Sequence, residues 1–184
     1  ISILLQDYEY KNNYNPVEHI KSRLKSYDSA SRKLISRGYD VTVKNIEEHV
    51  HDMVGIRIVC SFLSDVKKIV KMIEDSDQIT VHDKEDYIAN PKETGYSSYH
   101  LNVYVPVYLI DGVTMVAAEI QIRTVAMDFW ASLDHKITYK FKGEIPIEIQ
   151  EEMQKCADDI HKLDQKMLNL NNQMQEIKED QEVI

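Results

Sequence analysis

Three residues with chemically active side chains recur at every second position near the middle of the chain. In the run AAEIQIR, Glu119, Gln121 and Arg123 alternate with apolar residues. Side chains of a β-strand alternate between its two faces, so these three share one face while the residues between them point into a core. Carboxylate, amide and guanidinium groups on one surface can exchange protons, orient hydroxyl groups and neutralise anions. A water-facing sheet surface gives the same alternation.

The residues before this strand complete a β-hairpin that adds a second polar row. The dipeptide Asp111-Gly112 is typical of a two-residue turn, and it places Ile110 opposite Val113. A bulge at Pro106 would shift this register by one. Without the bulge, three cross-strand pairs share one face: His100 with Arg123, Asn102 with Gln121, and Tyr104 with Glu119. A water-facing surface does not need this many polar side chains. A functional surface therefore becomes as good an explanation as a solvated one.

The composition sets limits on what these residues serve. The chain has 184 residues, 43% of them hydrophobic and 29% charged, as expected for one soluble domain with a sizeable core. The net charge of −9 argues against broad nucleic-acid binding and leaves room for a local basic pocket that takes a small anion. Cys60 and Cys156 have no metal-ligand spacing, and no run resembles a membrane span or a signal peptide. We therefore expect a cytoplasmic protein without a membrane or a stable nucleic-acid partner.

Most of the chain should form regular structure, because it contains only five Gly and four Pro. KNIEEHVHDM predicts a short helix before VGIRIVCSF, a buried strand rich in β-branched residues, and LSDVKKIVKMIEDS predicts an amphipathic helix. IANPKETGYSSYH is a loop punctuated by Pro91 and Gly95. NPVEHIKSRLKSYDSASRKLISRG is ambiguous, because its apolar residues fit a helical stripe while HIKSRLK alternates as a strand does.

The last forty residues carry a heptad pattern. Nine residues recur at alternating spacings of four and three: Ile149, Met153, Cys156, Ile160, Leu163, Met167, Leu170, Met174 and Ile177. This stripe predicts a C-terminal amphipathic helix that finds a partner helix, and its three methionines indicate an adaptable interface. Packing of the helix on its own domain is the alternative.

Four ordered motifs then identify a resemblance. They are RLK at Arg23 and Lys25, HDMVGIRIVC around Asp52 and Arg57, NPKETGYSSYH ending at His100, and EIQIRTVAMDFWASLDHK from Glu119. Over about residues 15–142, the chain resembles the synthetase domain of the RelA/SpoT-homologue proteins, and most closely the stand-alone small alarmone synthetases.

The resemblance implies an activity, a fold and an assembly. The family transfers pyrophosphate from ATP to the 3′-hydroxyl of GTP or GDP, and its α+β fold is a mixed β-sheet flanked by helices, of nucleotidyltransferase type. The ambiguous segment then becomes a strand followed by a helix from about Tyr27. Residues 1–143 would form the catalytic domain and residues 144–184 a helical oligomerisation segment. The assembly that the resemblance implies is a homo-oligomer, a tetramer.

The resemblance also assigns roles to residues. Asp52, Glu119 and Gln121 are the catalytic candidates, and Asp52 and Glu119 would bind Mg²⁺, a hard cation that prefers oxygen ligands. Arg23 and Arg57 would sandwich adenine, and Tyr96 would stack on guanine. The full ATP set is Arg23, Lys25, Ser29, Lys33 and Arg57, and the GDP or GTP set is Lys92, Tyr96, His100, Gln121 and Arg123.

Two positions depart from the family pattern, which often has Arg or Gln at Ser97 and Asn at Thr94. Ser97 cannot neutralise a phosphate as Arg would, so the preference between GDP and GTP can differ from that of other members.

Two other functions remain open. HVHD at residues 49–52 is similar to the His-Asp pair of metal-dependent phosphohydrolases, but no second pair follows it. His49 and His51 alone are too few ligands for a zinc site. A nucleotide-binding regulatory or scaffold protein without turnover would need the C-terminal helix but not the pocket motifs.

Overall fold

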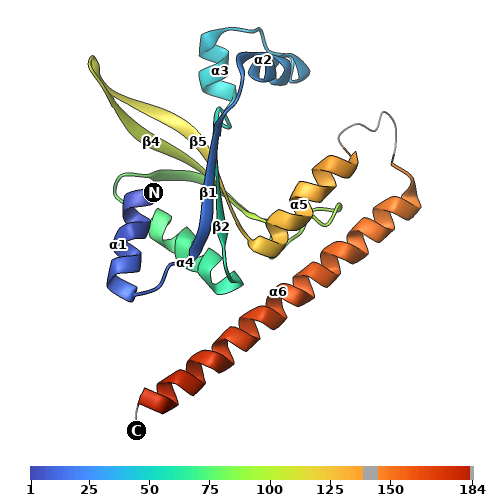
Figure 1. Ribbon diagram of the computed structural model, residues 1–184. Helices are drawn as coiled ribbons and strands as arrows, with labels where there is room; N and C mark the ends of the chain where they lie inside the picture. The colour runs from blue at the N-terminus through green and yellow to red at the C-terminus, as the bar shows by residue number, and fades with distance from the viewer. Residues whose placement is uncertain (139–144, 183–184) are drawn as a thin grey trace.

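One five-stranded mixed sheet organises the molecule (Figure 1). The computed structural model describes residues 1–138 and 145–182. The strands lie in the order β1 (Val17–Leu24), β2 (Val54–Cys60), β5 (Gly112–Thr124), β4 (Tyr99–Leu109) and β3 (Thr80–Asp86). The helices are α1 (Ser2–Asn12), α2 (Tyr27–Ser36), α3 (Val43–His49), α4 (Leu63–Glu74), α5 (Val125–Thr138) and α6 (Ile147–Glu182). Only β2 and β5 pair in parallel, so the expected α+β fold with a mixed sheet is confirmed.

The apolar residues of the alternating strands face α4 and form the main core. Ala118, Ile120 and Ile122 of β5 are almost completely buried against the apolar stripe of α4, which includes Ile69 and Ile73. Burying a side chain such as Ile stabilises the fold by roughly 1.5–3 kcal/mol. Because strand side chains alternate, this core commits Glu119, Gln121 and Arg123 to the opposite face of the sheet.

The ambiguous N-terminal segment forms a strand and then a helix, as the resemblance implies, so the helical stripe is wrong. Val17–Leu24 pairs antiparallel with β2, whose backbone edge would otherwise stay unpaired. Ser26 then caps α2, because its side chain accepts a hydrogen bond from the backbone N–H of Ser29. Helices α2 and α3 share a small second core of Ala30, Leu34, Ile46 and Val50 beyond the ends of β1 and β2 (Figure 1).

The predicted register of the β4–β5 hairpin is wrong by two residues. The turn lies at Ile110 and Asp111, and Leu109 pairs with Gly112. An Asp-Gly turn of the predicted kind needs a positive φ at Asp111. Here Asp111 does not have a positive φ, whereas Gly112 has a φ of 130°. Gly112 therefore begins β5 instead of ending the turn. The observed pairs are His100 with Gln121, Asn102 with Glu119 and Tyr104 with Ala117, with no shift at Pro106. A slip of two keeps every side chain on its predicted face.

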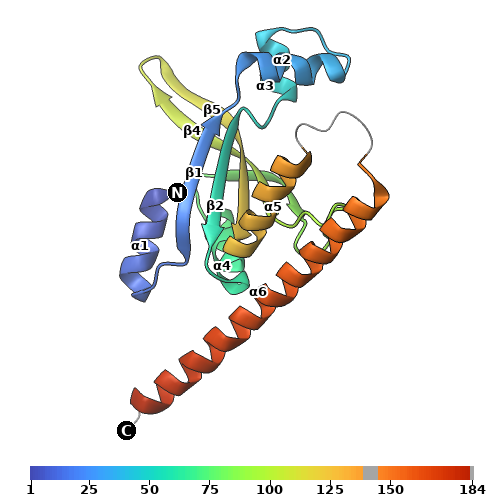
Figure 2. The ribbon, with the colours of Figure 1, turned by 45° about the vertical axis from the view of Figure 1, so that its right-hand side comes forward.

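The tail forms the long helix α6, which contacts both α5 and α4 (Figure 2). The expected boundary at residues 143 and 144 lies outside the described residues. Met153, Ala157, Ile160 and Asp164 are buried or half-buried against the body of the molecule. The later part of the heptad stripe is about half exposed, at 47–52%: Leu163, Met167, Leu170, Met174 and Ile177. The helix therefore packs on its own domain along one stripe and leaves a second apolar stripe uncovered in the single chain.

Across residues 1–138 and 145–182, no helix is both long and apolar enough to cross a membrane.

Candidate active site

The polar face of the sheet is arranged in two rows that run across the strands. Strand pairing places Arg23, Gly55, Glu119, Asn102 and Asp83 at one level. The next level holds Lys21, Arg57, Gln121, His100 and Glu85. Residues that are separated by about 100 positions in the sequence thus become neighbours on one surface.

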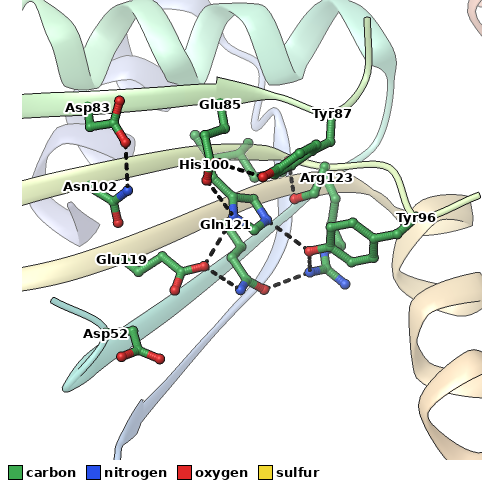
Figure 3. Close-up of polar contacts among 12 residues, drawn as sticks. Asp52, Asp83, Glu85, Tyr87, Tyr96, His100, Asn102, Glu119, Gln121 and Arg123 are labelled. Atoms are coloured by element: carbon green, nitrogen blue, oxygen red, sulfur yellow. Dashed lines mark hydrogen bonds and ion pairs between the residues drawn. The ribbon is translucent and has the colours of Figure 1, made fainter. Parts of the chain in front are cut away.

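Five side chains on this face close a ring of polar contacts (Figure 3). Gln121 Nε2 donates to Glu119 Oε1 at 2.8 Å, and Arg123 Nη2 donates to Gln121 Oε1 at 2.7 Å. Arg123 Nη2 also donates to Tyr96 Oη at 2.8 Å. The ring closes through His100, whose Nε2 lies 2.9 Å from Tyr96 Oη and whose Nδ1 lies 3.2 Å from Glu119 Oε1. Four of the five predicted acceptor-site residues and the predicted catalytic Glu119 therefore form one network.

The ring has one consistent direction of hydrogen bonding. A hydrogen bond to His100 is the largest influence on Glu119 and lowers its pKa; Gln121 lowers it further, while burial opposes both. An ionised Glu119 can only accept, so His100 must donate from Nδ1. In the neutral imidazole, Nε2 then accepts the hydroxyl proton of Tyr96, whose own pKa is raised mainly by burial. The network delivers two donors to Glu119 and keeps it charged.

Beside the ring, an open cleft of about 280 Å³ brings both predicted metal carboxylates together. Its wall consists of Lys21, Ser22, Arg23, Asp52, Gly55, Ile56, Arg57, Glu119 and Gln121. Asp52 lies between two lysines, with Lys25 Nζ at 2.5 Å and Lys33 Nζ at 2.8 Å. Burial alone would raise the pKa of Asp52, but the hydrogen bonds and charges of Lys25 and Lys33 outweigh burial and lower it. Both carboxylates are therefore ionised near neutral pH.

The donor set of the cleft fits a magnesium ion that is shared with a nucleotide. Among residues 1–138 and 145–182, no three His, Cys, Asp or Glu side chains form a metal-binding group. Mg²⁺ is commonly held by one or two carboxylates together with substrate phosphates, and does not require a cage made of protein alone. Asp52 and Glu119 provide two such carboxylates in one cleft.

Asp128 was missed by sequence reasoning and links two of the three arginines of the site, Arg57 and Arg123. It lies in the first turn of α5, directly after β5. Its Oδ1 is 3.2 Å from Arg57 Nη1 and 3.5 Å from Arg123 Nη1, and its Oδ2 is 3.9 Å from His19 Nε2. An acid in the first turn of a helix that follows a polar-faced strand was the available signal.

The loop between β3 and β4 presents aromatic and basic groups at the ring. Lys92 Nζ lies 4.3 Å from the ring centre of Tyr87 and 5.4 Å from that of Tyr96. Backbone hydrogen bonds from Lys92 N to Tyr96 O and from Gly95 N to Lys92 O shape the loop. Ser97 is oriented differently: it lines a small cavity with Ile160 and His161 of α6.

Two groups of predicted residues do not join the cleft. Ser29 lies one turn before Lys33 on α2 and is not part of the cleft wall. His49 stacks on Tyr39 at 3.9 Å between ring centres, and His51 packs against His82 at 5.4 Å. Within the described ranges 1–138 and 145–182, neither histidine belongs to a cluster of three or more metal-ligating side chains, which a His-Asp hydrolase or a zinc site would require.

Comparison with known proteins agrees with the geometry. A family model described as a region found in RelA / SpoT proteins matches residues 22–144. The chain belongs to the RelA/SpoT family. Every predicted site residue lies inside the matched region, and the described part of α6 lies beyond it.

Individual RelA/SpoT-type proteins match most of the chain. GTP pyrophosphokinase YwaC of Bacillus subtilis is 44% identical over 94% of this chain and 82% of its own length. GTP pyrophosphokinase YjbM of the same organism is 37% identical over 92% of this chain and 79% of its own. The crystal structure of small alarmone synthetase 1 from B. subtilis bound to its product pppGpp superposes with a TM-score of 0.84 at 34% identity. That match covers 95% of this chain and 88% of the synthetase, so the likeness includes α6.

Proposed function

We propose that this chain is a (p)ppGpp synthetase: it transfers pyrophosphate from ATP to the 3′-hydroxyl of GDP or GTP. The main support for this proposal is that the cleft and the hydrogen-bonded ring share two residues, Glu119 and Gln121. One side of Glu119 faces the basic cleft, and its other side faces Tyr96 through His100. A donor and an acceptor nucleotide bound on the two sides would meet at this carboxylate. The names of the two B. subtilis relatives support the same reaction.

The reaction places clear demands on the residues around the cleft. The acceptor's 3′-oxygen forms a bond to the β-phosphorus of ATP. The bond from that phosphorus to the oxygen that bridges the α- and β-phosphates breaks, and AMP leaves with this oxygen. Phosphoryl transfer depends mainly on positioning and charge stabilisation. Arg23 and Arg57 would hold adenine, and Lys25, Ser29 and Lys33 the phosphates. The two arginines and two lysines among these residues provide a local positive surface on a protein of net charge −9.

Glu119 is the group we assign to the acceptor's hydroxyl, because the amide of Gln121 cannot take a proton. Its lowered pKa makes it a hydrogen-bond acceptor that orients the hydroxyl and receives its proton only as the new bond forms. Gln121 would hold Glu119 and the ribose in position relative to each other. Tyr96 would stack on guanine, His100 and Arg123 would hold the Tyr96 hydroxyl in place, and Lys92 would meet the acceptor's charge.

Asp52 and Glu119 are the residues that would hold Mg²⁺. When bound, the ion would offset the charge of the transferring phosphates. Lys25 and Lys33 neutralise Asp52 in the free protein, and both would be released toward the phosphates when Asp52 takes the ion.

We assign residues 1–143 to catalysis and residues 144–184 to assembly as a homo-oligomer, with a tetramer as the expected state. The exposed stripe from Leu163 to Ile177 supports a partner helix, because an apolar stripe of this length is rarely left in water. We expect a cytoplasmic enzyme without a stable nucleic-acid partner.

The proposal is tested by mixing the protein with ATP, GDP or GTP, and Mg²⁺, and then separating the nucleotides. AMP and a guanosine nucleotide with a 3′-pyrophosphate should accumulate in equal amounts. ADP and phosphate would contradict the reaction. Mg²⁺-dependent thermal stabilisation by a non-hydrolysable ATP analogue without any product would instead favour a scaffold that binds nucleotide without turnover.

A further inference from the structure

We infer that α6 directly supports the loop between β3 and β4, which carries Lys92 and Tyr96 and is called the acceptor loop below. Ala157 of α6 is then a positioning residue for Tyr96. This inference rests on the proposed function, in which Tyr96 holds the acceptor base. The first part of α6 would then determine affinity for the guanine nucleotide within each chain, apart from any role of α6 in assembly.

The loop approaches α6 closely at Gly95, the residue before Tyr96. A Cβ atom built on Gly95 would lie 2.5 Å from Ala157 Cβ, 3.3 Å from Gln154 Oε1 and 3.4 Å from Trp130 Cζ2. Gly95 also has a φ of 86°, which other residues rarely adopt. The loop backbone therefore lies directly on α6, and this contact requires small residues on both sides. A larger side chain at position 157 would push the loop toward the ring.

The contact continues through Ser97, on the other side of Tyr96. Ser97, Met127 and Ile160 help to line a cavity of about 20 Å³ between the loop, α5 and α6. Ser97 Oγ is buried there without a hydrogen-bond partner among the described residues. Tyr96 is thus flanked by two residues whose closest surroundings include α6, while its own hydroxyl points into the ring.

Two polar contacts hold α6 in this position. Thr124 Oγ1 donates to Asp164 Oδ2 at 2.5 Å, and both side chains are almost completely buried. Thr124 directly follows Arg123 of the ring, and its Oγ1 also accepts from Met127 N at the start of α5. Trp130 Nε1 donates to Met153 O at 3.3 Å. The helix is therefore fixed against the same strand end and helix that carry Arg123 and Asp128.

Of the residues assigned to ATP, Arg57 contacts Asp128 of α5, whereas the others lie on β1, on α2 or between them. Arg23 lies on β1, and Lys33 lies on α2, whereas α6 contacts α5 and α4. In Figures 1 and 2, α2 lies above the ends of β1 and β2, and α6 passes below it beside α5 and α4. A disturbance at Ala157 should therefore reach the acceptor side first.

The test is Ala157→Leu in the full chain, because Leu is a good helix former and adds bulk where Gly95 approaches α6. The KM for GDP should rise about tenfold to a hundredfold, since misplacement by about 1 Å can cost that much. The KM for ATP should stay within about twofold of the parent's value, because the ATP side is not displaced. Ala157→Ser adds only a hydroxyl group and should keep the parent's KM for GDP. Lys166→Leu lies on an exposed part of α6 and should leave both KM values unchanged.

A second variant and a structural readout make the outcome decisive. Asp164→Leu removes the partner of Thr124 and should raise the KM for GDP selectively, whereas Asp164→Asn keeps an acceptor and should not. Hydrogen–deuterium exchange of the amides of Lys92 and Gly95 should quicken in Ala157→Leu, because the loop hydrogen bonds protect them in the parent. This readout needs no turnover, so it tests the contact even if the parent forms no alarmone. Unchanged exchange, equal rises in both KM values, or a changed oligomeric mass by light scattering as the sole effect would overturn the inference.

Discussion

Glu119 receives hydrogen bonds from both His100 and Gln121, and together with Gln121 it belongs to both the cleft and the ring. Glu119→Gln keeps the shape of the side chain but removes the charge that we assign to Mg²⁺ and to the acceptor's hydroxyl. Turnover should fall by more than about 100-fold, which is ~2.7 kcal/mol in the barrier, while the melting temperature stays close to that of the parent. Asp83→Asn, on the same sheet face but hydrogen-bonded to Asn102, is the matched control and should keep its activity. Activity of Glu119→Gln within about tenfold of the parent would remove Glu119 from catalysis.

Tyr96 combines an aromatic face with a hydroxyl that joins Arg123 to His100. Two substitutions separate these parts. Tyr96→Ala should weaken GDP binding by about 1–3 kcal/mol, because base stacking is lost. Tyr96→Phe should keep stacking and lose about 0.5–1.5 kcal/mol through the hydrogen bonds. Isothermal titration with GDP and with an ATP analogue would show both losses on the GDP side alone; an equal loss for both nucleotides would place Tyr96 outside the acceptor site.

At the scale of elements, the buried contact between α6 and the end of β5 gives the fold a pH dependence. Burial is the largest influence on Asp164 and raises its pKa, and the hydrogen bond from Thr124 only partly offsets it. The folded state therefore holds the proton more tightly than the unfolded state does. The free energy of unfolding therefore falls as pH rises from the unfolded pKa of about 3.9 through the raised pKa of the folded state.

Asp164→Asn cannot ionise and escapes that penalty. The melting temperature of Asp164→Asn relative to the parent should therefore increase as pH rises from about 4 to 8. Thermal denaturation across that range measures it, with Asp159→Asn, an exposed acid on α6, as the control. A difference that stays constant with pH would mean that Asp164 ionises in the folded protein as readily as in the unfolded chain.

Elements with strong local patterns could be read from the sequence, and elements defined by distant partners could not. The β-branched run of β2 and the apolar stripe of α4 predicted their structures directly. Strand β3 was missed because it is an edge strand whose side chains are mostly exposed and charged, so only its pairing with β4 defines it. The alternation in β5 gave the correct face, but the register depended on which residue could adopt a positive φ at the turn.

The same limit applies to the site. Local motifs identified Asp52 and Glu119, and the structure brings both into one cleft. Asp128 carries no pattern that distinguishes it from any acid at a helix start, and its importance comes from Arg57 and Arg123 on two different strands. The packing of Ala157 on Gly95 joins residues 62 positions apart, and no periodicity in the tail predicted it.

In the molecule as a whole, α6 has two apolar stripes with different surroundings. One stripe covers α5 and the acceptor loop, and the other, from Leu163 to Ile177, faces water in the single chain. Met167→Lys combined with Met174→Lys places two charges on the exposed stripe and should lower the oligomeric mass measured by light scattering. The fold should survive, since both positions are about half exposed. Gln173→Lys adds a charge elsewhere on the helix and should keep the parent's mass; the parent's mass in the double variant would show that this stripe does not hold the assembly.

In the proposed reaction, both phosphates of the transferred group come from ATP and end on the guanosine ribose. This transfer can be followed with ATP labelled at the β-phosphorus, incubated with Mg²⁺ and either GDP or its 3′-deoxy analogue. The proposed reaction predicts that the label moves to the guanosine nucleotide as AMP forms, and that the 3′-deoxy analogue receives none. Label that remains in ADP, or that moves equally to the 3′-deoxy analogue, would contradict it.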